Sequence, residues 1–365
     1  KRWLKHLLLD PSDRISDPPG IKVRPAEGIH AIDYLSDSPL LKTPTFCFGE
    51  MIKELSNVGY SPENLHALPY DWRLPPAELE KRDRLLTKLK LKIEEMKELN
   101  QQKVVILAHS MGNKLSHYFL SWVELKSPGW CDDNIHALMS LAPPFLGSPK
   151  TVRSVIYGDL AGLDTFLSID EGREIHRGMA VLPWLFPVKA HHLPDVNIRI
   201  ASSEKSKEPK RKSQKSQSLP FTEADTETIL NQYYPKSLEF LDKHFKQDPL
   251  CLKADGHDLP NQLKPPPVNK LWVIVGINVP TEVTAYYKHA KDADGNDALV
   301  LDASADKYSR KKVSGINPRG LVITGGIGRE TKHTYQPSAR VNKSGDGTVP
   351  YCSLNYAEST WRPYA

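Results

Sequence analysis

Residues 104–120 read VVILAHSMGNKLSHYFL, and this stretch decides the fold. Its first part, 104–107, is apolar and largely β-branched, which is typical of a strand buried on both faces of a parallel sheet. From Lys114 onward, apolar residues recur at helical spacing as far as Trp122. Only residues 109–111 separate the two patterns, so the sequence predicts a strand, a very tight turn and a helix.

Ser110 lies at the tip of this turn. Residues 108–112, AHSMG, match the nucleophile elbow G-x-S-x-G, except that alanine replaces the first glycine. In such an elbow a strained turn exposes the serine hydroxyl, and a backbone N–H at the helix N-terminus, here that of Met111, faces a developing oxyanion. A five-residue match also arises by chance, with a serine that only starts a helix. The strand before it and the helix after it favour a catalytic serine.

Further strands and helices predict an α/β fold with a mostly parallel central sheet covered on both faces. Residues 77–100 read as one charged helix with an apolar face, and 137–142 and 271–276 read as two more buried strands. More than a hundred residues of weak periodicity separate those two strands, which is where a cap would be inserted. We therefore expect a hydrolase core in residues 1–148, a cap or lid in 149–235 and the rest of the core in 236–365.

The composition indicates a folded chain with one strongly basic segment. The protein has 365 residues, of which 39% are hydrophobic, and no apolar run approaches the length of a membrane span. Of the formal net charge of +5, residues 202–218 carry +4, from six Lys/Arg and two Glu. We interpret this tract as a disordered, solvated loop, with a tether to anionic lipid headgroups as the alternative. No basic–aromatic pattern points to nucleic acid as a partner.

The four cysteines exclude a zinc knuckle because they are far apart and form no C-x-x-C pair, so we expect no metal site. Two disulfides are permitted and not required. Residues 342–344, Asn-Lys-Ser, form a glycosylation sequon, which favours a lumenal compartment. The first residues lack the apolar core of a secretory signal and do not begin with methionine, so the chain is interpreted as a fragment.

Asp346 is the candidate acid. It lies in the sequence SGDGTVP, residues 344–350, where glycines on both sides carry the aspartate on a tight turn. An ordinary Asx turn is the simpler interpretation, and a calcium loop would need more oxygen ligands. In α/β-hydrolases, however, the triad follows the chain order Ser, Asp or Glu, His. No histidine follows Asp346; the last of 13 is His333, and His109 is expected to pack beside the elbow.

Four segments in order together resemble the lecithin:cholesterol acyltransferase-like enzymes. They are the elbow AHSMGN at 108–113, PYDWRL at 69–74, APPFLGS at 142–148 and GDGTVPY at 345–351. Within that family, residues 70–84 and 265–287 are most similar to the phospholipid:sterol acyltransferases, and the likeness covers roughly residues 1–360.

The resemblance implies an α/β-hydrolase fold with a cap, and an enzyme that moves a fatty acyl group from a phospholipid to a sterol hydroxyl without a cofactor. It implies that Ser110 is the nucleophile and Asp346 the acid. The family's histidine and its second oxyanion donor would fall beyond the two ends of this sequence, so we expect a chain truncated at both ends. The resemblance also implies a membrane-associated enzyme of the endoplasmic reticulum or secretory-pathway lumen, acting at a lipid surface. Phospholipase A activity, diacylglycerol as acceptor and an inactive lipid-binding relative remain open alternatives.

Overall fold

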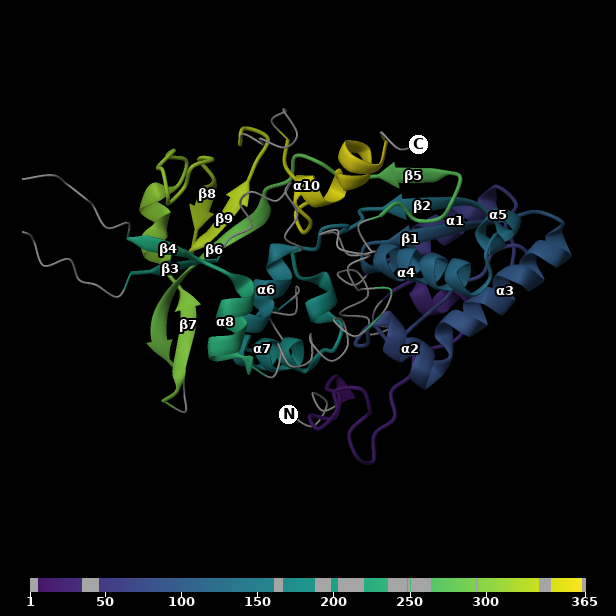
Figure 1. The fold of residues 1–365 in the computed structure, drawn as a ribbon, viewed down its shortest axis with the longest axis horizontal. Helices are drawn as coiled ribbons and strands as arrows, with labels where there is room; N and C mark the ends of the chain where they lie inside the picture. Colours follow the sequence, from purple (N-terminus) through teal and green to yellow (C-terminus); the bar gives the residue numbers. More distant parts are fainter. Residues whose placement is uncertain are drawn as a thin grey trace, which may run out of the picture.

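A computed structural model describes residues 6–34, 46–160, 167–187, 198–202, 220–235, 248, 250, 264–292, 295–334 and 343–362. It contains two sheets that lie side by side along the long axis of the molecule (Figure 1). The first sheet has the order β1-β2-β5 and is parallel throughout, with strands β1 (Val104–His109), β2 (Ile135–Leu141) and β5 (Leu271–Ile274). These are the three strands that the sequence predicts, and they make the fold α/β.

Five described helices of the N-terminal half belong to the same part of the molecule as this sheet (Figure 1). They are α1 (Gly49–Asn57), α2 (Pro76–Asp83), α3 (Leu85–Asn100), α4 (Met111–Lys126) and the short α5 (Trp130–Asn134). The single helix predicted over 77–100 is wrong in one respect, because the chain breaks it at Arg84. Arg84 adopts the left-handed conformation, with φ 58° and ψ 35°. A non-glycine residue of this kind leaves no signal in a helical pattern that runs on through it.

The parallel sheet is covered unequally within the described residues, and here the expectation of burial on both faces is wrong. One face packs its side chains, among them Ala108 and Leu138, into the core shared with α4. On the opposite face, Val105, Trp272 and Ile274 are 44%, 61% and 51% exposed. The strand register places these three side chains on the same face, since successive residues of a strand alternate.

The second sheet was not predicted. Its order is β4-β3-β6-β9-β8, with β7 also paired to β6, and every pairing is antiparallel except β3 with β6. The strands are β3 (Ile198–Ala201), β4 (Phe221–Ala224), β6 (Thr281–Lys291), β7 (Asp297–Leu301), β8 (Val322–Thr324) and β9 (Ile327–Glu330). Because β3 and β4 come from the expected cap and the others from beyond residue 235, the sheet crosses the predicted division at that residue.

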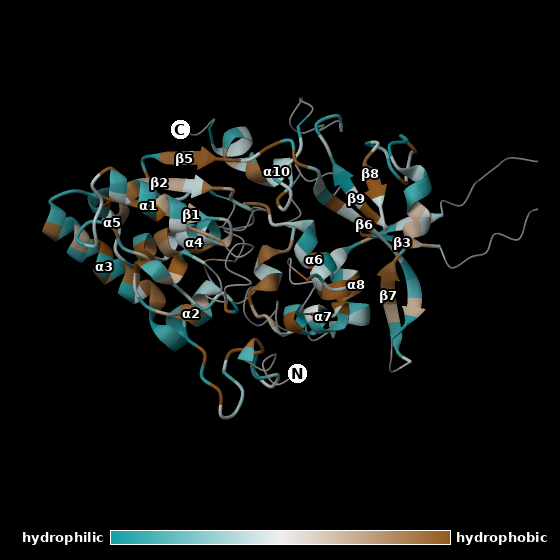
Figure 2. Ribbon diagram, turned by 180° about the vertical axis from the view of Figure 1, so that it is seen from behind, coloured by the Kyte–Doolittle hydropathy of each residue, from teal (hydrophilic) through white to brown (hydrophobic). Residues whose placement is uncertain are grey.

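Helices connect the two sheets. Between them lie α6 (Pro149–Ile156), α7 (Ile169–Gly178), the turn η3 (Leu182–Leu185) and α8 (Thr226–Tyr233), with α10 (Tyr351–Leu354) along the upper edge in Figure 1. The chain also forms η2 (Ile29–Ile32), η5 (Ala303–Tyr308) and a π-helical turn, η6 (Ala357–Trp361). One hydrophobic core includes side chains of α4, α6, α7 and β3. Figure 2 shows that apolar and polar residues are mixed along the helices α4 and α7. The described part of residues 149–235 therefore shares its hydrophobic core with the parallel sheet and its helices.

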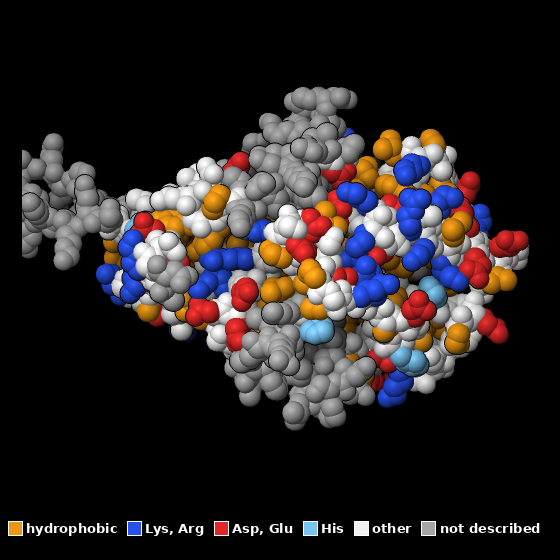
Figure 3. Space-filling view, turned by 90° about the horizontal axis from the view of Figure 1, so that it is seen from below, with side chains coloured by type: hydrophobic (Ala, Val, Ile, Leu, Met, Phe, Trp, Pro, Cys, Tyr) orange, Lys and Arg blue, Asp and Glu red, His pale blue; other side chains and the backbone are white. Residues whose placement is uncertain are grey.

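The surface shows charges of both signs. On the face in Figure 3, Lys and Arg side chains are interspersed with Asp and Glu. The basic tract 202–218 lies outside the described residues except for Ser202. Within the described part of the chain, every helix is too short or too polar to cross a bilayer.

Candidate active site

Ser110 lies between β1 and α4, where the sequence predicts an elbow. It is the N-cap of α4 and has φ 49° and ψ −123°, a conformation that L-residues rarely adopt. Its N–H donates to the carbonyl of Leu141 at 2.9 Å, and its own carbonyl accepts the N–H of Asn113 at 3.0 Å. The backbone of the serine is thereby fixed to the end of the neighbouring strand β2.

Each of the three parallel strands is followed by a strained residue at the same edge of the sheet. Ala142, directly after β2, has φ 46° and donates its N–H to the carbonyl of Ile274 at 2.9 Å. Asn278, beyond β5, has φ 67° and donates to the carbonyl of Ser344 at 3.0 Å. Strain of this kind, together with Ser110, gathers at the carboxyl edge where ligands bind in open α/β sheets.

The side chain of Asn113 holds the elbow in place by hydrogen bonds, and the sequence did not predict this role. Its side chain is fully buried, and Nδ2 donates to the carbonyls of Leu141 at 2.8 Å and Ser110 at 3.1 Å. A buried amide thus reinforces the backbone contact between the elbow and β2. The sequence gives no signal for this role, because the neighbours of Asn113 on the same helix face, Ser116 and His117, are also polar.

Met111 is the first residue of α4, a helix of 16 residues. The N–H groups of a first helical turn have no acceptor within the helix, and the helix dipole adds positive potential there. The N–H of Met111 belongs to this first turn, directly after Ser110, and its part as an oxyanion donor stays a prediction.

Asp346 sits on the loop before α10, and this loop lies against the residues that follow β5. It forms a parallel bridge with Val279, and a Cβ at Gly276 would lie 3.3 Å from the Cβ of Asp346. Its Oδ1 accepts the N–H groups of Thr348 at 2.9 Å and Val349 at 2.8 Å, so the residue does form an Asx-type turn. Within the described residues Oδ2 accepts no hydrogen bond, and this oxygen is the one left to orient another group.

Ser110 and Asp346 lie at the same edge, on either side of β2. Neighbouring strands are about 4.8 Å apart, so the ends of β1 and β5 are separated by roughly 10 Å. The pKa of His109 shows that Asp346 lies near the elbow. Burial lowers this pKa, and the negative charge of Asp346 acts in the opposite direction. Its ring packs edge-on against Phe48, with centroids 6.0 Å apart.

No described histidine bonds to either residue. His333 donates its backbone N–H to Thr331, and His117 is buried behind the elbow beside Trp361. Burial, and secondarily the charge of Lys114, lowers the pKa of His117 to about 4. The histidines at 191, 192, 244 and 257 lie outside the described residues.

The segment around η3 is held next to the elbow by a buried hydrogen bond and by close backbone packing. Lys114, only 5% exposed, donates from Nζ to the carbonyl of Trp184 at 2.7 Å. A Cβ at Gly147 would lie 2.3 Å from the carbonyl oxygen of Phe186, so only glycine permits this close approach. The described segment around η3, which belongs to the expected cap in 149–235, therefore packs tightly beside Ser110.

The PYDWRL segment supplies a buried ion network below this contact. Arg73 donates to Asp71 at 2.8 Å and 2.9 Å and to Asp17 at 2.9 Å, and Arg82 also donates to Asp71 at 2.8 Å. Burial by itself would raise the pKa of Asp71, but the hydrogen bonds from Arg73 and Arg82 lower it below its ordinary value. The carbonyl of Arg73 in turn accepts the N–H of Val181, next to η3. The motif is thus a structural support for the cap.

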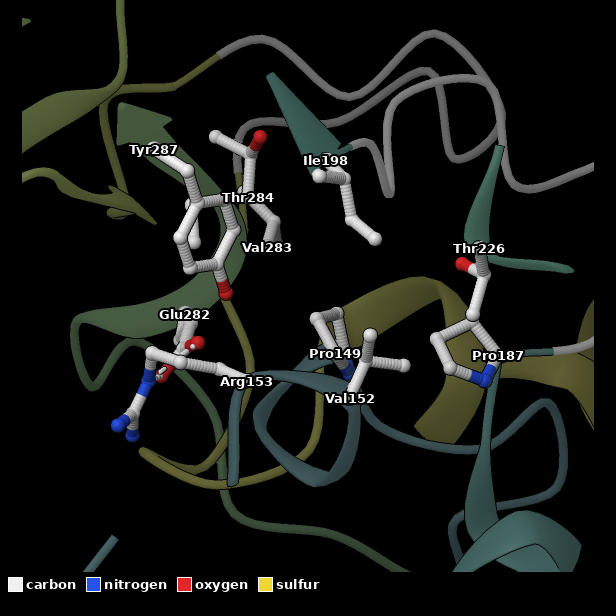
Figure 4. A pocket seen from close by; sticks show the side chains of 11 residues that line it. Pro149, Val152, Arg153, Pro187, Ile198, Thr226, Glu282, Val283, Thr284 and Tyr287 are labelled. Carbon is white, nitrogen blue, oxygen red and sulfur yellow. Dashed lines mark hydrogen bonds and ion pairs between the residues drawn. The ribbon is translucent and has the colours of Figure 1, made fainter. Parts of the chain in front are cut away.

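A separate cavity lies between α6 and β6. It has an empty volume of about 280 Å³, part of it open to solvent. Figure 4 shows Tyr287 pointing toward the ion pair of Arg153 and Glu282, whose Nε–Oε1 distance is 2.8 Å. Neither Ser110 nor Asp346 lines it, and the charged side chains at its wall are already paired.

Comparisons with known proteins give one family. A family model for lecithin:cholesterol acyltransferase matches residues 1–364. A phospholipid:diacylglycerol acyltransferase of Schizosaccharomyces pombe is 27% identical, over 96% of this chain and 56% of its own length. A phospholipid–sterol O-acyltransferase of Arabidopsis thaliana is 27% identical, over 99% and 62%. A phosphatidylcholine-sterol acyltransferase of Gallus gallus is 33% identical, over 48% and 40%. The chain thus spans little more than half the length of the first two relatives.

Proposed function

The chain belongs to the lecithin:cholesterol acyltransferase family, and we propose that the protein transfers a fatty acyl group from a phospholipid to a lipid alcohol through an acyl-enzyme on Ser110. The observation that carries the proposal is the strained elbow: a serine with φ 49° at the N-terminus of a helix, across one strand from a carboxylate. The names of the relatives, all acyltransferases that use a phospholipid, support the donor.

In the proposed reaction the Ser110 hydroxyl attacks the carbonyl carbon of a phospholipid ester. A histidine accepts the serine proton, and Asp346, through its unbonded Oδ2, orients that imidazole and stabilises its charged form. The N–H of Met111 stabilises the oxyanion. The lysophospholipid oxygen takes the proton and leaves, and an alcohol then attacks the acyl-enzyme while the same histidine takes and returns a proton.

The acceptor is proposed to be a sterol, with diacylglycerol as the second candidate. The Arabidopsis relative supports a sterol, and the Schizosaccharomyces relative, at the same identity, supports diacylglycerol. Water would compete with either alcohol, so transfer requires that the site exclude it. The segment around η3 is suited to excluding water, because its tight packing restricts the movement of the cap beside Ser110.

The protein expressed from its full gene, supplied with acyl-labelled phospholipid and with sterol or diacylglycerol separately, tests the proposal. We expect labelled sterol ester, and a loss of at least about 10³-fold on Ser110→Ala or Asp346→Asn. Ser116→Ala, a buried serine on the same helix, and Asp306→Asn are matched controls. Asp306, like Asp346, accepts two backbone N–H groups, those of Gly325 and Gly326, but it lies in η5, away from the elbow.

The labelled product distinguishes transfer to a sterol from transfer to diacylglycerol and from hydrolysis. Labelled triacylglycerol in place of sterol ester would change the acceptor. Labelled free fatty acid alone, under saturating acceptor, would make the protein a phospholipase. Full activity of Ser110→Ala would refute the acyl-enzyme.

We also propose that the protein works at a lipid surface in the lumen of the endoplasmic reticulum or a later secretory compartment. The support is the phospholipid donor and the sequon at 342–344. A shift in electrophoretic mobility on glycosidase treatment of the cellular protein, absent after Asn342→Gln, would support a lumenal location, and an unmodified protein would count against it.

A further inference from the structure

The loop that carries Asp346 is held at its base by one side chain of the second sheet. Glu330, the last residue of β9, is fully buried, and its Oε1 accepts the N–H of Gly345 at 2.9 Å and the N–H of Tyr351 at 2.8 Å. These two residues flank the loop. A single carboxylate oxygen therefore joins the segment that enters the loop to α10, the helix that follows it.

The other oxygen of Glu330 fixes the carboxylate itself. Oε2 accepts a hydrogen bond from Arg319, 2.9 Å away and 8% exposed. Hydrogen bonds to an ionised carboxylate are shorter and about twice as strong as those between neutral groups. The charged side chain of Glu330 is thus held rigidly in the second sheet, and it supports a loop at the edge of the parallel sheet.

The loop that carries Asp346 is too tightly packed to adjust if the Glu330 carboxylate moves. A Cβ at Gly345 would lie 1.9 Å from the carbonyl oxygen of Val349, so the two sides of the loop touch. Thr281, at the start of β6, accepts the N–H of Gly347 at 2.9 Å, and Ser148 donates to the carbonyl of Thr348 at 2.8 Å. In contrast to these neutral contacts, Glu330 is charged and holds both sides at once.

We propose that Glu330 is a positioning residue for the reaction: it sets the place and direction of the Asp346 carboxylate without touching the substrate. The inference rests on the proposed function, since it assumes that Asp346 orients a catalytic imidazole. A displacement of about 1 Å at a reacting group costs up to about 10²-fold in rate. Glu330 lies in an antiparallel sheet that the elbow and the acid do not belong to, so the second sheet takes part in building the active site.

The test compares Glu330→Gln with Glu282→Gln in the protein expressed from its full gene. Glu282 is a buried carboxylate of the same sheet, bonded to Arg153 and not to the loop. We expect Glu330→Gln to lower kcat by about 10- to 100-fold with KM almost unchanged. The acid limb of the pH–rate profile should move to lower pH, because a misdirected carboxylate no longer raises the pKa of the imidazole. Glu282→Gln should leave kcat and the profile near wild type.

Glu330→Asp separates position from charge, since it keeps the charge and shortens the side chain by one methylene. A loss like that of Glu330→Gln supports positioning, and full activity overturns it. If Glu330→Gln does not fold, Thr281→Val, which removes the acceptor for the N–H of Gly347 and the donor to the carbonyl of Val279, should give a smaller loss of the same kind.

Equal effects of Glu330→Gln and Glu282→Gln on kcat and pH profile, with Asp346→Asn inactive, would sink this inference and leave the proposed function standing. Full activity of Asp346→Asn would overturn both.

Discussion

Replacing Ser110 by glycine should stabilise the protein while it abolishes activity. The residue has φ 49° and ψ −123°, a conformation in which a Cβ is sterically unfavourable and which glycine adopts without strain. Ser110→Ala is the reference, because alanine also removes the hydroxyl but keeps the Cβ. The difference in stability between the two variants therefore measures the backbone strain at the elbow.

The magnitude follows from two opposing terms. A non-glycine residue in a sparsely populated conformation costs about 1–3 kcal/mol, and glycine loses about 0.4–1 kcal/mol through its freer unfolded chain. Ser110→Gly should thus be about 1 kcal/mol more stable than Ser110→Ala. At about 2.1 cal/mol/K of unfolding entropy per residue, the 365 residues give about 0.8 kcal/mol/K, so Tm should rise by about 1.3 °C.

Urea unfolding and calorimetry measure this difference, and Ser121 provides the control. Ser121 lies in the middle of α4, where glycine should be less stable than alanine by about 1 kcal/mol. The sign of the Gly–Ala difference should therefore reverse between the two sites. If Ser110→Gly is no more stable than Ser110→Ala, the elbow is not strained and the geometric basis for a catalytic serine fails.

Three further predictions concern the loop, the buried histidine and the buried ion network. Gly345→Ala should lower kcat/KM by about 10²-fold, because its Cβ would overlap the Val349 carbonyl and open the acid loop; near-wild-type kinetics would refute this contact. Stability should fall between pH 6.5 and pH 4, by about 2 kcal/mol at pH 5, since the unfolded chain protonates His117 before the folded state does; His117→Phe should remove that part of the pH dependence in urea titrations. Arg73→Met should cost about 3 kcal/mol in the free energy of unfolding, because it strips Asp71 and Asp17 of a buried partner, and a change below about 1 kcal/mol would show that Arg82 suffices.

The parallel sheet could be predicted because its strands are short apolar runs with turn signals after them. The second sheet could not: β6 mixes Thr, Glu and Tyr with aliphatic residues and is buried along its first seven positions, so it shows no alternation. Its β3 and β4 have only four residues each. Pairing between strands far apart in the chain, and not any local pattern, creates this sheet.

The elbow could be located from the sequence because a strand, a serine and a helix follow one another within a few residues. Ser110 and Asp346 carry recognisable local signatures, and their catalytic roles stay predictions. Asn113 and Glu330 carry none: one reads as a helix residue and the other as the end of a strand. Their parts in the site exist only through contacts to distant carbonyl and N–H groups, which no spacing rule records.

The fastening of the acid loop to the second sheet also has a consequence for the growing polypeptide. Ser110 is made 236 residues before Asp346, which at about 5–20 residues per second is roughly 10–50 s of translation. During that interval the nascent chain carries the serine without its acid, and β9 with Glu330 must be made and paired before the loop can close. On the proposed mechanism, a nascent chain that meets lipid on its way out of the ribosome therefore transfers no acyl group until both sheets have assembled.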